Sequence, residues 1–517
     1  MNLDSRDPEA QRDVGLTKNT SSVNIPLESV KTDKTSNASP IMGPGEGPKI
    51  DDTLVSWSGP DDPQNPQNMP QWKKWVITWL LSFLNVWVTF SSTIFASAVR
   101  TTSLEYGVSR VVMTLGVSLT VLGFAVGPLI WGPMSEVIGR LTPFYFGYAV
   151  FCIFQIPVGV AQNVYTILIC RFFIGFFGTS AMAVTPGVLA DIFSPKDRGV
   201  AVSVYAAAAF IGPIFGPIVG GFVVDSSLGR RWTAWITLIL ASAFGLAALL
   251  FVPETYGPII LQRRAARLRQ ETRNFAYHSA LDENPPTLND ILFKYFLRPF
   301  QMLIKEPILL LVTLYISLVY GVLYLFFVAY PIEFFEVRRW THAGVAALPL
   351  LAVMLGTLAG CLTILFVTGH TYPRKMAKMG RVPPEERLKL MMVGSVSLPI
   401  GLFWFGWTSS RSVHWFAQTA AGFPIGIGLA LIWVQGLSFL IDVYLMFANS
   451  ALAGNTLIRS AVGAAFPLFG APMYHKLGVN WASSLLGFLS VAMIPIPVAF
   501  YYYGPKIRAK SKFSPKL

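Results

Sequence analysis

The sequence predicts an all-α membrane protein with about twelve spanning helices in two six-helix halves. The chain has 517 residues, of which 53% are hydrophobic and only 13% are charged, about half the charged fraction of an ordinary soluble chain. Stretches such as 75–98 and 232–252 contain no ionisable side chain, and each has roughly the 20 residues that a helix needs to cross a hydrocarbon core. The apolar residues run continuously instead of alternating, which favours helices over a barrel.

The apolar segments divide the chain into two halves. Residues 1–72 are polar and poor in aromatics, and we expect a disordered cytosolic tail there. A six-helix half at 73–253, a cytosolic central loop at 254–306, a second six-helix half at 307–503 and a basic tail at 504–517 follow. The expected spans are 75–95, 111–131, 142–161, 166–189, 200–224, 232–253, 308–330, 343–367, 388–408, 414–441, 449–474 and 482–503.

The distribution of basic residues predicts that both termini lie in the cytosol. With that orientation most of the 40 Lys and Arg residues fall in the inside segments, as the positive-inside rule requires. The sequons at Asn19 and Asn37 would then stay unmodified. No apolar signal-peptide core precedes the first span, and we expect that span to direct insertion, into the plasma membrane or alternatively the vacuolar membrane.

Composition and motifs argue against several other classes of protein. The net charge of +13 does not indicate a nucleic-acid partner, because the basic residues lie between spans. Cys152, Cys170 and Cys361 lie within apolar segments, so neither a disulfide framework nor a metal site is predicted. The metalloprotease, nucleotide-binding and serine-hydrolase motifs are absent from the sequence. We therefore expect no enzyme activity and no cofactor.

A weak internal repeat supports the two-half architecture. A constant offset aligns Asp191 with Asp442 and Gly212 with Gly463. Each aspartate closes a span just before a short loop and a span rich in Gly, Ala and Pro. Two related halves are one of the standard plans of membrane transporters.

The loop after the second span is rich in glycine and charge. Gly132 and Gly139 allow a tight turn, and Glu136 and Arg140 lie where charges can reach interfacial water. One interpretation is an ordinary charged loop. A sharper one is a conformational latch, in which Glu136 caps the N-terminal end of a helix in the other half and Arg140 pairs with Asp191.

Two arginines, Arg171 and Arg459, lie within predicted spans. A charge at the centre of a span costs at least ~2.5 kcal/mol and indicates a functional residue by default. The alternative is that the side chain snorkels to the nearer interface. Arg171 lies several residues from the start of its span, so both interpretations stay open.

The fifth span carries a stripe of small residues. Gly212, Gly216, Gly220 and Gly221 can bring two helices close together, and Pro217 bends the helix. The spacing does not say which side of the membrane this packing closes.

Polar and aromatic side chains within the spans predict a substrate cavity near the midplane. Their alternative role is an interhelical hydrogen bond or aromatic core packing. No acid lies in the middle third of any predicted span, so a polyamine would lack the carboxylates that offset its desolvation, and an uncharged or amphipathic aromatic compound fits better. The candidates are Asn85, Thr89, Tyr320, Tyr324, Phe327, Gln435 and Asn455.

These motifs resemble those of the major facilitator superfamily. Residues 132–140 are similar to its loop motif between helices 2 and 3, and Arg171 with Gly175 is similar to its helix-4 motif. The Gly and Pro positions of the fifth span match the motif of drug:proton antiporters. The resemblance extends over about residues 55–505. Likeness to the fungal twelve-spanning multidrug branch is carried by 57–63, 253–256, 298–300, 306–307, 320–324 and 467–469.

The resemblance implies a proton-coupled efflux transporter that exports drugs, toxins or fungal secondary metabolites. It implies a latch role for Glu136, Arg140 and Asp191, a part in proton coupling for Arg171, and a hinge and seal at the glycine stripe. A polyamine exporter and a proton-coupled nutrient importer or facilitator of the same fold are the alternatives, and a non-transporting membrane receptor or a membrane enzyme is a remote alternative. The expected partners are a small-molecule substrate, protons and the lipid bilayer, and we expect the protein to function as a monomer.

Overall fold

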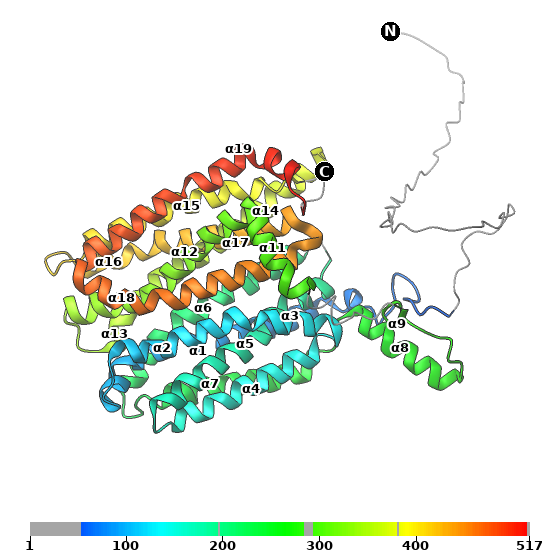
Figure 1. The fold of residues 1–517 in the computed structure, drawn as a ribbon, viewed down its shortest axis with the longest axis horizontal. Coiled ribbons are helices and arrows are strands. Elements are labelled where there is room, and N and C mark those ends of the chain that lie inside the picture. Colours follow the sequence, from blue (N-terminus) through cyan, green and yellow to red (C-terminus); the bar gives the residue numbers. More distant parts are fainter. Residues whose placement is uncertain (1–52, 195–196, 284–292, 380–381, 514–517) are drawn as a thin grey trace, which may run out of the picture. The chain divides into compact units, whose positions relative to one another are not determined.

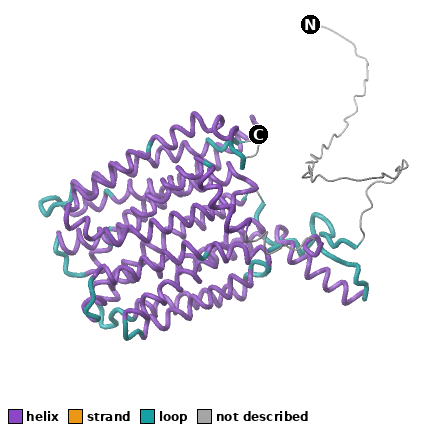
Figure 2. Tube along the Cα trace, viewed as in Figure 1, coloured by secondary structure: helices purple, strands orange, loops and turns teal. Residues whose placement is uncertain are grey.

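The computed structural model describes residues 53–194, 197–283, 293–379 and 382–513. Within them all the long elements are helices, joined by loops (Figure 2). Most of the predicted N-terminal tail, including both sequons, lies outside the described residues.

The first half consists of six membrane-length helical segments. Their starting points follow local sequence signals, because a Ser or Asn side chain can accept a hydrogen bond from an otherwise unpaired backbone N–H in the first turn. Ser109 caps α2 in this way at 3.3 Å, and Asn163 caps α5 at 2.8 Å. The elements are α1 (Gln71–Glu105), α2 (Arg110–Val126) continued by α3 (Pro128–Val137), α4 (Leu141–Val160), α5 (Val164–Ile192), α6 (Arg198–Asp225) and α7 (Trp232–Phe251).

The second half begins with α12 (Pro307–Tyr330), which continues as the π-helical segment η3 (Pro331–Val337). Proline at the first position suits a helix start, because it has no N–H to leave unpaired. The remaining elements are α13 (Ala343–Ala347), α14 (Leu350–Met379), α15 (Glu386–Trp407), α16 (Trp415–Ala420), α17 (Gly422–Tyr444), the short η4 (Leu445–Phe447), α18 (Ala448–Met493) and α19 (Pro495–Lys510).

Eleven continuous helical segments of the described chain are long and apolar enough to cross a membrane. The last covers 63 residues, but it is broken at Gly478, whose φ of 73° and ψ of 164° are not helical. This break falls between the predicted spans 449–474 and 482–503. The predicted all-α membrane architecture with about twelve spans is thereby confirmed.

The central segment, which we expected to be a loop, is partly helical. It contains α8 (Gly257–Thr272), α9 (Ala280–Glu283), the π-helical turn η2 (Phe293–Leu297) and α11 (Arg298–Lys305). The last helix, α19, also continues into the stretch that we expected to be a basic tail. Apolar residues such as Met302 and Leu303 are buried on α11, and this burial explains why the segment folds.

The last part of the expected tail, residues 53–70, has fixed contacts instead of being disordered. The Asp62 carboxylate accepts hydrogen bonds at 2.9 Å from the backbone N–H groups of Ser58 and Gln64. It also accepts one at 2.7 Å from Arg264 of α8. Charge-assisted hydrogen bonds therefore hold this polar stretch, although it buries little apolar surface.

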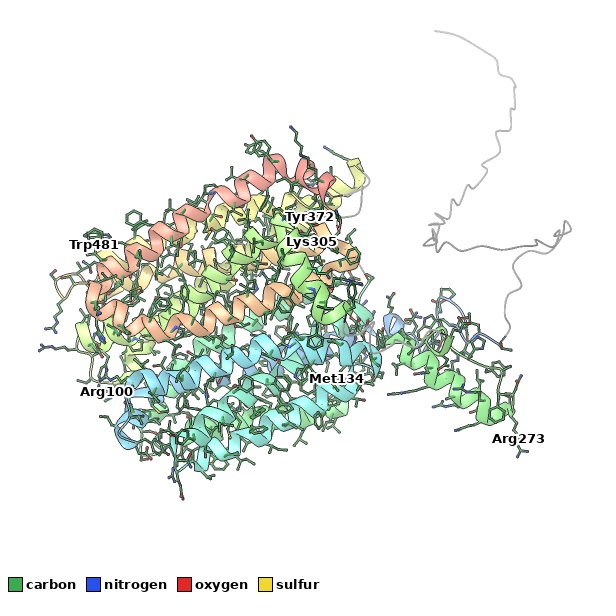
Figure 3. All side chains as sticks on the ribbon, viewed as in Figure 1. Arg100, Met134, Arg273, Lys305, Tyr372 and Trp481 are labelled. Carbon is green, nitrogen blue, oxygen red and sulfur yellow. The ribbon has the colours of Figure 1, made fainter. Side chains whose placement is uncertain are left out.

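The long helices run side by side, so the bundle has two ends (Figure 1). Met134 of α3 and Lys305 of α11 lie at one end, which we call the Met134 end (Figure 3). Arg100 of α1 and Trp481 of α18 lie at the other, which we call the Arg100 end (Figure 3).

The packing of the two halves follows the internal repeat. Gly212 of α6 lies so close to α1 that an added Cβ would overlap Thr89. The aligned Gly463 of α18 lies equally close to Tyr320 of α12, whose ring carbons are 2.6 and 2.8 Å from its Cβ position. Each half thus uses a glycine at the same place to bring its fifth helix against its first.

Candidate functional site

A cavity of about 180 Å³ lies between the two halves. Its walls come from α1, α2 and α6 of the first half and from α12, η3, α13 and α18 of the second. Its floor includes Tyr324 and Phe327, which are almost fully buried. Its mouth includes the exposed Arg100, Arg110 and Glu336, so the cavity reaches the surface at the Arg100 end.

Charged side chains cross the mouth of the cavity. Arg110 of α2 donates to Glu336 of η3 at 3.0 Å, and this ion pair joins the two halves. His475 of α18 lies 2.8 Å from the other oxygen of Glu336. Arg100 lies over the ring of Phe335 at 5.0 Å. All of these charges are near solvent, where ion pairs are weak and easily broken.

The floor of the cavity joins the halves through a hydrogen bond. The hydroxyl groups of Ser92 on α1 and Tyr324 on α12 are 3.0 Å apart. Tyr320 donates to the Tyr324 hydroxyl at 3.4 Å, and the two rings are in contact. Deeper in the bundle, the rings of Phe210 on α6 and Trp433 on α17 meet with centroids 4.3 Å apart. Aromatic contacts between the halves therefore close the path at mid-depth.

Only two of the seven predicted cavity residues, Tyr324 and Phe327, line the cavity. Thr89 points at α6 and donates to the Asn85 carbonyl at 2.9 Å. Asn455 donates to Thr313 at 3.2 Å within the second half. The side-chain amides of Asn85 and Gln435 are buried without a hydrogen-bond partner among the described residues.

Arg171 of α5 does not snorkel to an interface. Its side chain is 2% exposed and donates three hydrogen bonds of 2.9 Å to backbone carbonyls. One carbonyl is that of Gly116 on α2, and the others are those of Ser91 and Ser92 on α1. The guanidinium also lies over the ring of Phe95 at 4.7 Å. Arg171 therefore ties three helices together directly behind the Ser92–Tyr324 contact.

The structure brings Arg140 and Asp191 together at the Met134 end. Arg140 donates to the Asp191 carboxylate at 3.0 Å and to the Ser135 hydroxyl at 2.9 Å. Its guanidinium lies over the ring of Tyr256 at 4.7 Å. Burial raises the pKa of the Tyr256 phenol, so the ring offers Arg140 a neutral π face.

Glu254 belongs to this cluster, although sequence reasoning did not select it as a site residue. Its carboxylate accepts hydrogen bonds from the backbone N–H groups of Arg140 at 3.0 Å and Leu141 at 3.3 Å, at the start of α4. An acid at a helix N-terminus is stabilised by the unpaired N–H groups there. The turn before it needs Gly139, whose φ is 96°, whereas Gly132 has open space around its Cβ position. The signal in the sequence was the 253–256 motif, which we used only as a family marker.

Glu136 contacts the other half of the molecule instead of Arg140. Its carboxylate accepts a hydrogen bond of 3.0 Å from the Asn449 side chain, which lies in the first turn of α18. The donor is a side chain, so the predicted capping of a helix N-terminus by Glu136 stays a prediction. The contact holds the halves together at the Met134 end.

The second half contains a counterpart of the Arg140 cluster. Arg387 of α15 donates to Asp442 of α17 at 2.9 Å and lies over the ring of Tyr372 at 4.7 Å. Tyr372 also lies at the Met134 end (Figure 3). The internal repeat pointed to Asp442, but the sequence offset did not identify Arg387 as its partner.

The glycine stripe of α6 packs within its own half and also across the interface. Cβ atoms at Gly212, Gly216 and Gly220 would overlap atoms of α1. A Cβ atom at Gly221 would lie 2.6 Å from the backbone of Gly344 on α13, in the other half. The stripe therefore fixes the α1–α6 pair, and its last residue touches the second half at the Arg100 end.

Comparisons with known proteins agree with this architecture. The model of the Major Facilitator Superfamily matches residues 79–467. An ascochitine biosynthesis cluster MFS transporter of Didymella fabae is 98% identical over 517 residues, which is 100% of both chains. A citrinin biosynthesis cluster MFS transporter of Monascus ruber is 63% identical over 91% of this chain and 95% of the relative. The cercosporin MFS transporter of Cercospora nicotianae is 45% identical over 91% and 92%.

A solved structure gives the same fold. The proton:xylose symporter XylE, bound to 6-bromo-6-deoxy-D-glucose, matches 85% of this chain and 96% of its own with a TM-score of 0.59. At 15% identity this likeness concerns the fold alone. With the family match, the relatives and this fold, the chain belongs to the major facilitator superfamily.

Proposed function

We propose that this protein is a proton-coupled efflux transporter for a small aromatic or amphipathic secondary metabolite. The observation that carries the proposal is the cavity between the halves, with an aromatic floor and a mouth at the Arg100 end. A carrier needs such a path to open alternately on either side. The names of the relatives place them in secondary-metabolite clusters, which supports a product of such a cluster as the cargo.

We place the Met134 end in the cytosol and the Arg100 end outside. The count of basic residues supports this orientation. In this state the Glu136–Asn449 contact and the Phe210–Trp433 contact keep the cytosolic side closed. Export then requires both contacts to break so that the cytosolic side can open. The latch clusters around Asp191 and Asp442 lie where they can stabilise one state over the other.

Arg171 takes part in proton coupling through its neighbours. A guanidinium stays charged, so Arg171 does not carry the proton itself. Its hydrogen bonds to the carbonyls of Ser91 and Ser92 fix the part of α1 that contacts Tyr324. A change in protonation elsewhere can reach the cavity floor through this rigid link.

The charges of the cavity argue against a polyamine cargo. Glu336 is the one acid among the described residues that line the cavity, and it is already engaged by Arg110 and His475. A polycation entering the site would therefore find no free carboxylate to offset its desolvation.

The direct test measures flux of ascochitine, the first compound to examine because of the 98% identical relative. The purified full-length protein is placed in liposomes, and ascochitine movement is followed with and without an opposing proton gradient. We expect movement against the proton flow that a protonophore abolishes. Flux that ignores the gradient would contradict coupling. If ascochitine and the other compounds of the same cluster all fail to move, the exporter proposal is wrong.

A further inference from the structure

Arg459 lies deep in the bundle and has no hydrogen-bond or ion-pair partner among the described residues. Its side chain is 6% exposed, and its Nε atom is buried and unpaired. The guanidinium lies 4.8 Å from the ring centroids of both Tyr320 and Trp433. Two aromatic faces thus position this charge without neutralising it.

The other buried arginine shows how unusual this arrangement is. Arg171 is equally buried, but three backbone carbonyls accept its hydrogen bonds. For Arg459 the buried Nε donor has no acceptor among the described residues, and a buried donor without an acceptor is costly because it loses its water and gains no hydrogen bond in return. A sequence that keeps such a residue gains from it elsewhere.

A second unpaired donor lies beside Arg459. The indole Nε1 of Trp433 is buried with no hydrogen-bond partner in the described part of the chain. Since the guanidinium lies over the Trp433 ring at 4.8 Å, the two donors belong to neighbouring side chains. Such a pair of donors is suited to the oxygen atoms of an anion.

The surroundings of Arg459 adjoin the floor of the cavity. The Tyr320 ring that lies on Arg459 also contacts Tyr324, which forms the cavity floor. The Trp433 ring on its other side meets Phe210 of the first half. Arg459 itself does not line the cavity in this state, so the site proposed below requires Tyr320 and Tyr324 to move when a ligand enters.

We infer that Arg459 and Trp433 form the binding site for the acidic group of an organic anion, a carboxylate attached to a flat conjugated ring. The carboxylate accepts hydrogen bonds from the guanidinium and from the indole N–H. The ring system stacks among Tyr320, Tyr324 and Phe210. This inference rests on the proposed transport function and narrows its cargo from amphipathic aromatics to aromatic acids.

The first test needs no variant. The purified full-length protein in lipid nanodiscs is dialysed to equilibrium against 2-naphthoate, against its uncharged analogue 2-naphthamide, and against the cation 2-naphthylmethylammonium. We expect 2-naphthoate to bind ~10- to 100-fold more tightly than the amide, which is the worth of one charge-assisted contact. The cation should bind least. Equal binding of acid and amide, or binding of neither, would overturn the inference.

Variants of Arg459 separate binding from stability. Arg459→Gln removes the charge and should lower the affinity for 2-naphthoate ~10- to 100-fold, while the affinity for the amide stays the same. Arg459→Lys should keep part of the affinity. Because Arg459 has no hydrogen-bond or ion-pair partner among the described residues, Arg459→Gln should not lower the melting temperature. A lower melting temperature with unchanged 2-naphthoate binding would mean that Arg459 serves only the fold.

A matched control removes one positive charge far from the cavity. Arg263 is exposed on α8, and Arg263→Gln should bind 2-naphthoate like the wild type. The proposed binding site and the proposed transport function can be disproved independently of each other. If 2-naphthoate binds through Arg459 but no compound crosses the membrane, the transport proposal fails and the site stands. If uncharged compounds cross as well as acids do, the site fails and transport stands.

Discussion

Arg171 and Arg459 bring two positive charges into the interior of the bundle, and their surroundings give them different tasks. Arg171 uses its planar fork to hold carbonyls of two neighbouring helices. Arg459, as far as the described residues show, is held by the faces of two rings. At the scale of the residue, hydrogen-bond partners separate a structural cation from one that is available to a ligand.

Replacing Arg171 by Lys tests the structural role. A single ammonium group cannot reach three carbonyls on two helices, so Arg171→Lys loses part of this set of charge-assisted hydrogen bonds. We expect a loss of about 1–3 kcal/mol in the free energy of unfolding and at least a ~10-fold lower rate of substrate flux. Thermal unfolding and liposome flux measure the two effects. The control is Arg411→Lys, at an exposed site where Arg411 donates to the Val337 carbonyl, and it should change neither quantity. If Arg171→Lys has the stability and the flux of the wild type, the structural role of Arg171 is refuted.

The pH dependence of the 53–70 segment tests another single residue. Backbone N–H groups of Ser58 and Gln64, together with Arg264, hold the pKa of Asp62 at about 2, below its usual 3.8. Because folding lowers this pKa, the contact contributes its full stability above about pH 4. That stability is lost as the pH falls towards 2.

Hydrogen exchange at the amides of Ser58 and Gln64 measures this contact. After correction for intrinsic rates, we expect protection at neutral pH that decreases progressively as the pH falls from about 4 towards 2. Asp62→Asn should remove the protection already at pH 7, whereas Asn at the exposed neighbour Asp61 should not. Protection that persists in Asp62→Asn would show that other contacts hold the segment.

At the scale of the element, α6 is the helix on which the architecture depends most. Its glycines let α1 approach so closely that backbone meets backbone, and its residue Gly221 meets α13 of the other half. In lipid, such close packing replaces the hydrophobic effect as the force between helices. The same helix carries Phe210, which closes the path at mid-depth.

Two glycines of α6 form a matched pair for a stability experiment. A Cβ atom at Gly212 would overlap Thr89 and the Val86 carbonyl, whereas the Cβ position at Gly199 has nothing within 4 Å. We expect Gly212→Ala to destabilise the protein by about 1–3 kcal/mol. Gly199→Ala should stabilise it by about 0.4–1 kcal/mol. Thermal unfolding in detergent compares the two, and equal effects would mean that the α1–α6 contact tolerates extra volume.

At the scale of the whole molecule, the proposed transport function requires a second state that is open at the Met134 end. The cavity reaches the surface at the Arg100 end, and the Glu136–Asn449 hydrogen bond joins the halves at the Met134 end. Removing a contact at either end shifts the equilibrium between the two states only by the difference between the free energies that the contact contributes to each state. Removing the exposed Glu136–Asn449 hydrogen bond should therefore change the relative populations of the two states.

Removing the Glu136 carboxylate should favour the state that is open at the Met134 end. Thr114 lines the cavity, so a cysteine at Thr114→Cys, in a chain whose native cysteines are replaced by alanine, reports access from the Arg100 end. We expect Glu136→Ala to slow its labelling by a hydrophilic maleimide ~2- to 10-fold, because the contact contributes about 0.5–1.5 kcal/mol. Glu271→Ala on α8 is the control. Unchanged or faster labelling of the cysteine at position 114 would show that Glu136 does not help to close the Met134 end.

Much of the fold follows from the sequence, because hydropathy and small-residue spacing act along one helix at a time. The spans, and a break between 474 and 482 where Gly478 interrupts the helix, could be expected in this way. The pairing of Arg140 with Asp191 was expected from the charged loop after the second span. The cavity was harder to predict. Thr89 and Asn85 share a helix face with other polar residues, yet Thr89 faces α6, because the rotation of a helix is set by its neighbours.

The sequence by itself determined the number of spans, the two-half plan and the charged loop at the Met134 end. Long apolar runs allow no other solution in lipid, where every backbone group must be paired internally. The tertiary structure alone decided that Arg171 has acceptors and that the Nε atom of Arg459 has none within the described part of the chain. It also decided that Glu136 meets Asn449. Such partners lie on helices far apart in the chain, and only packing brings them together.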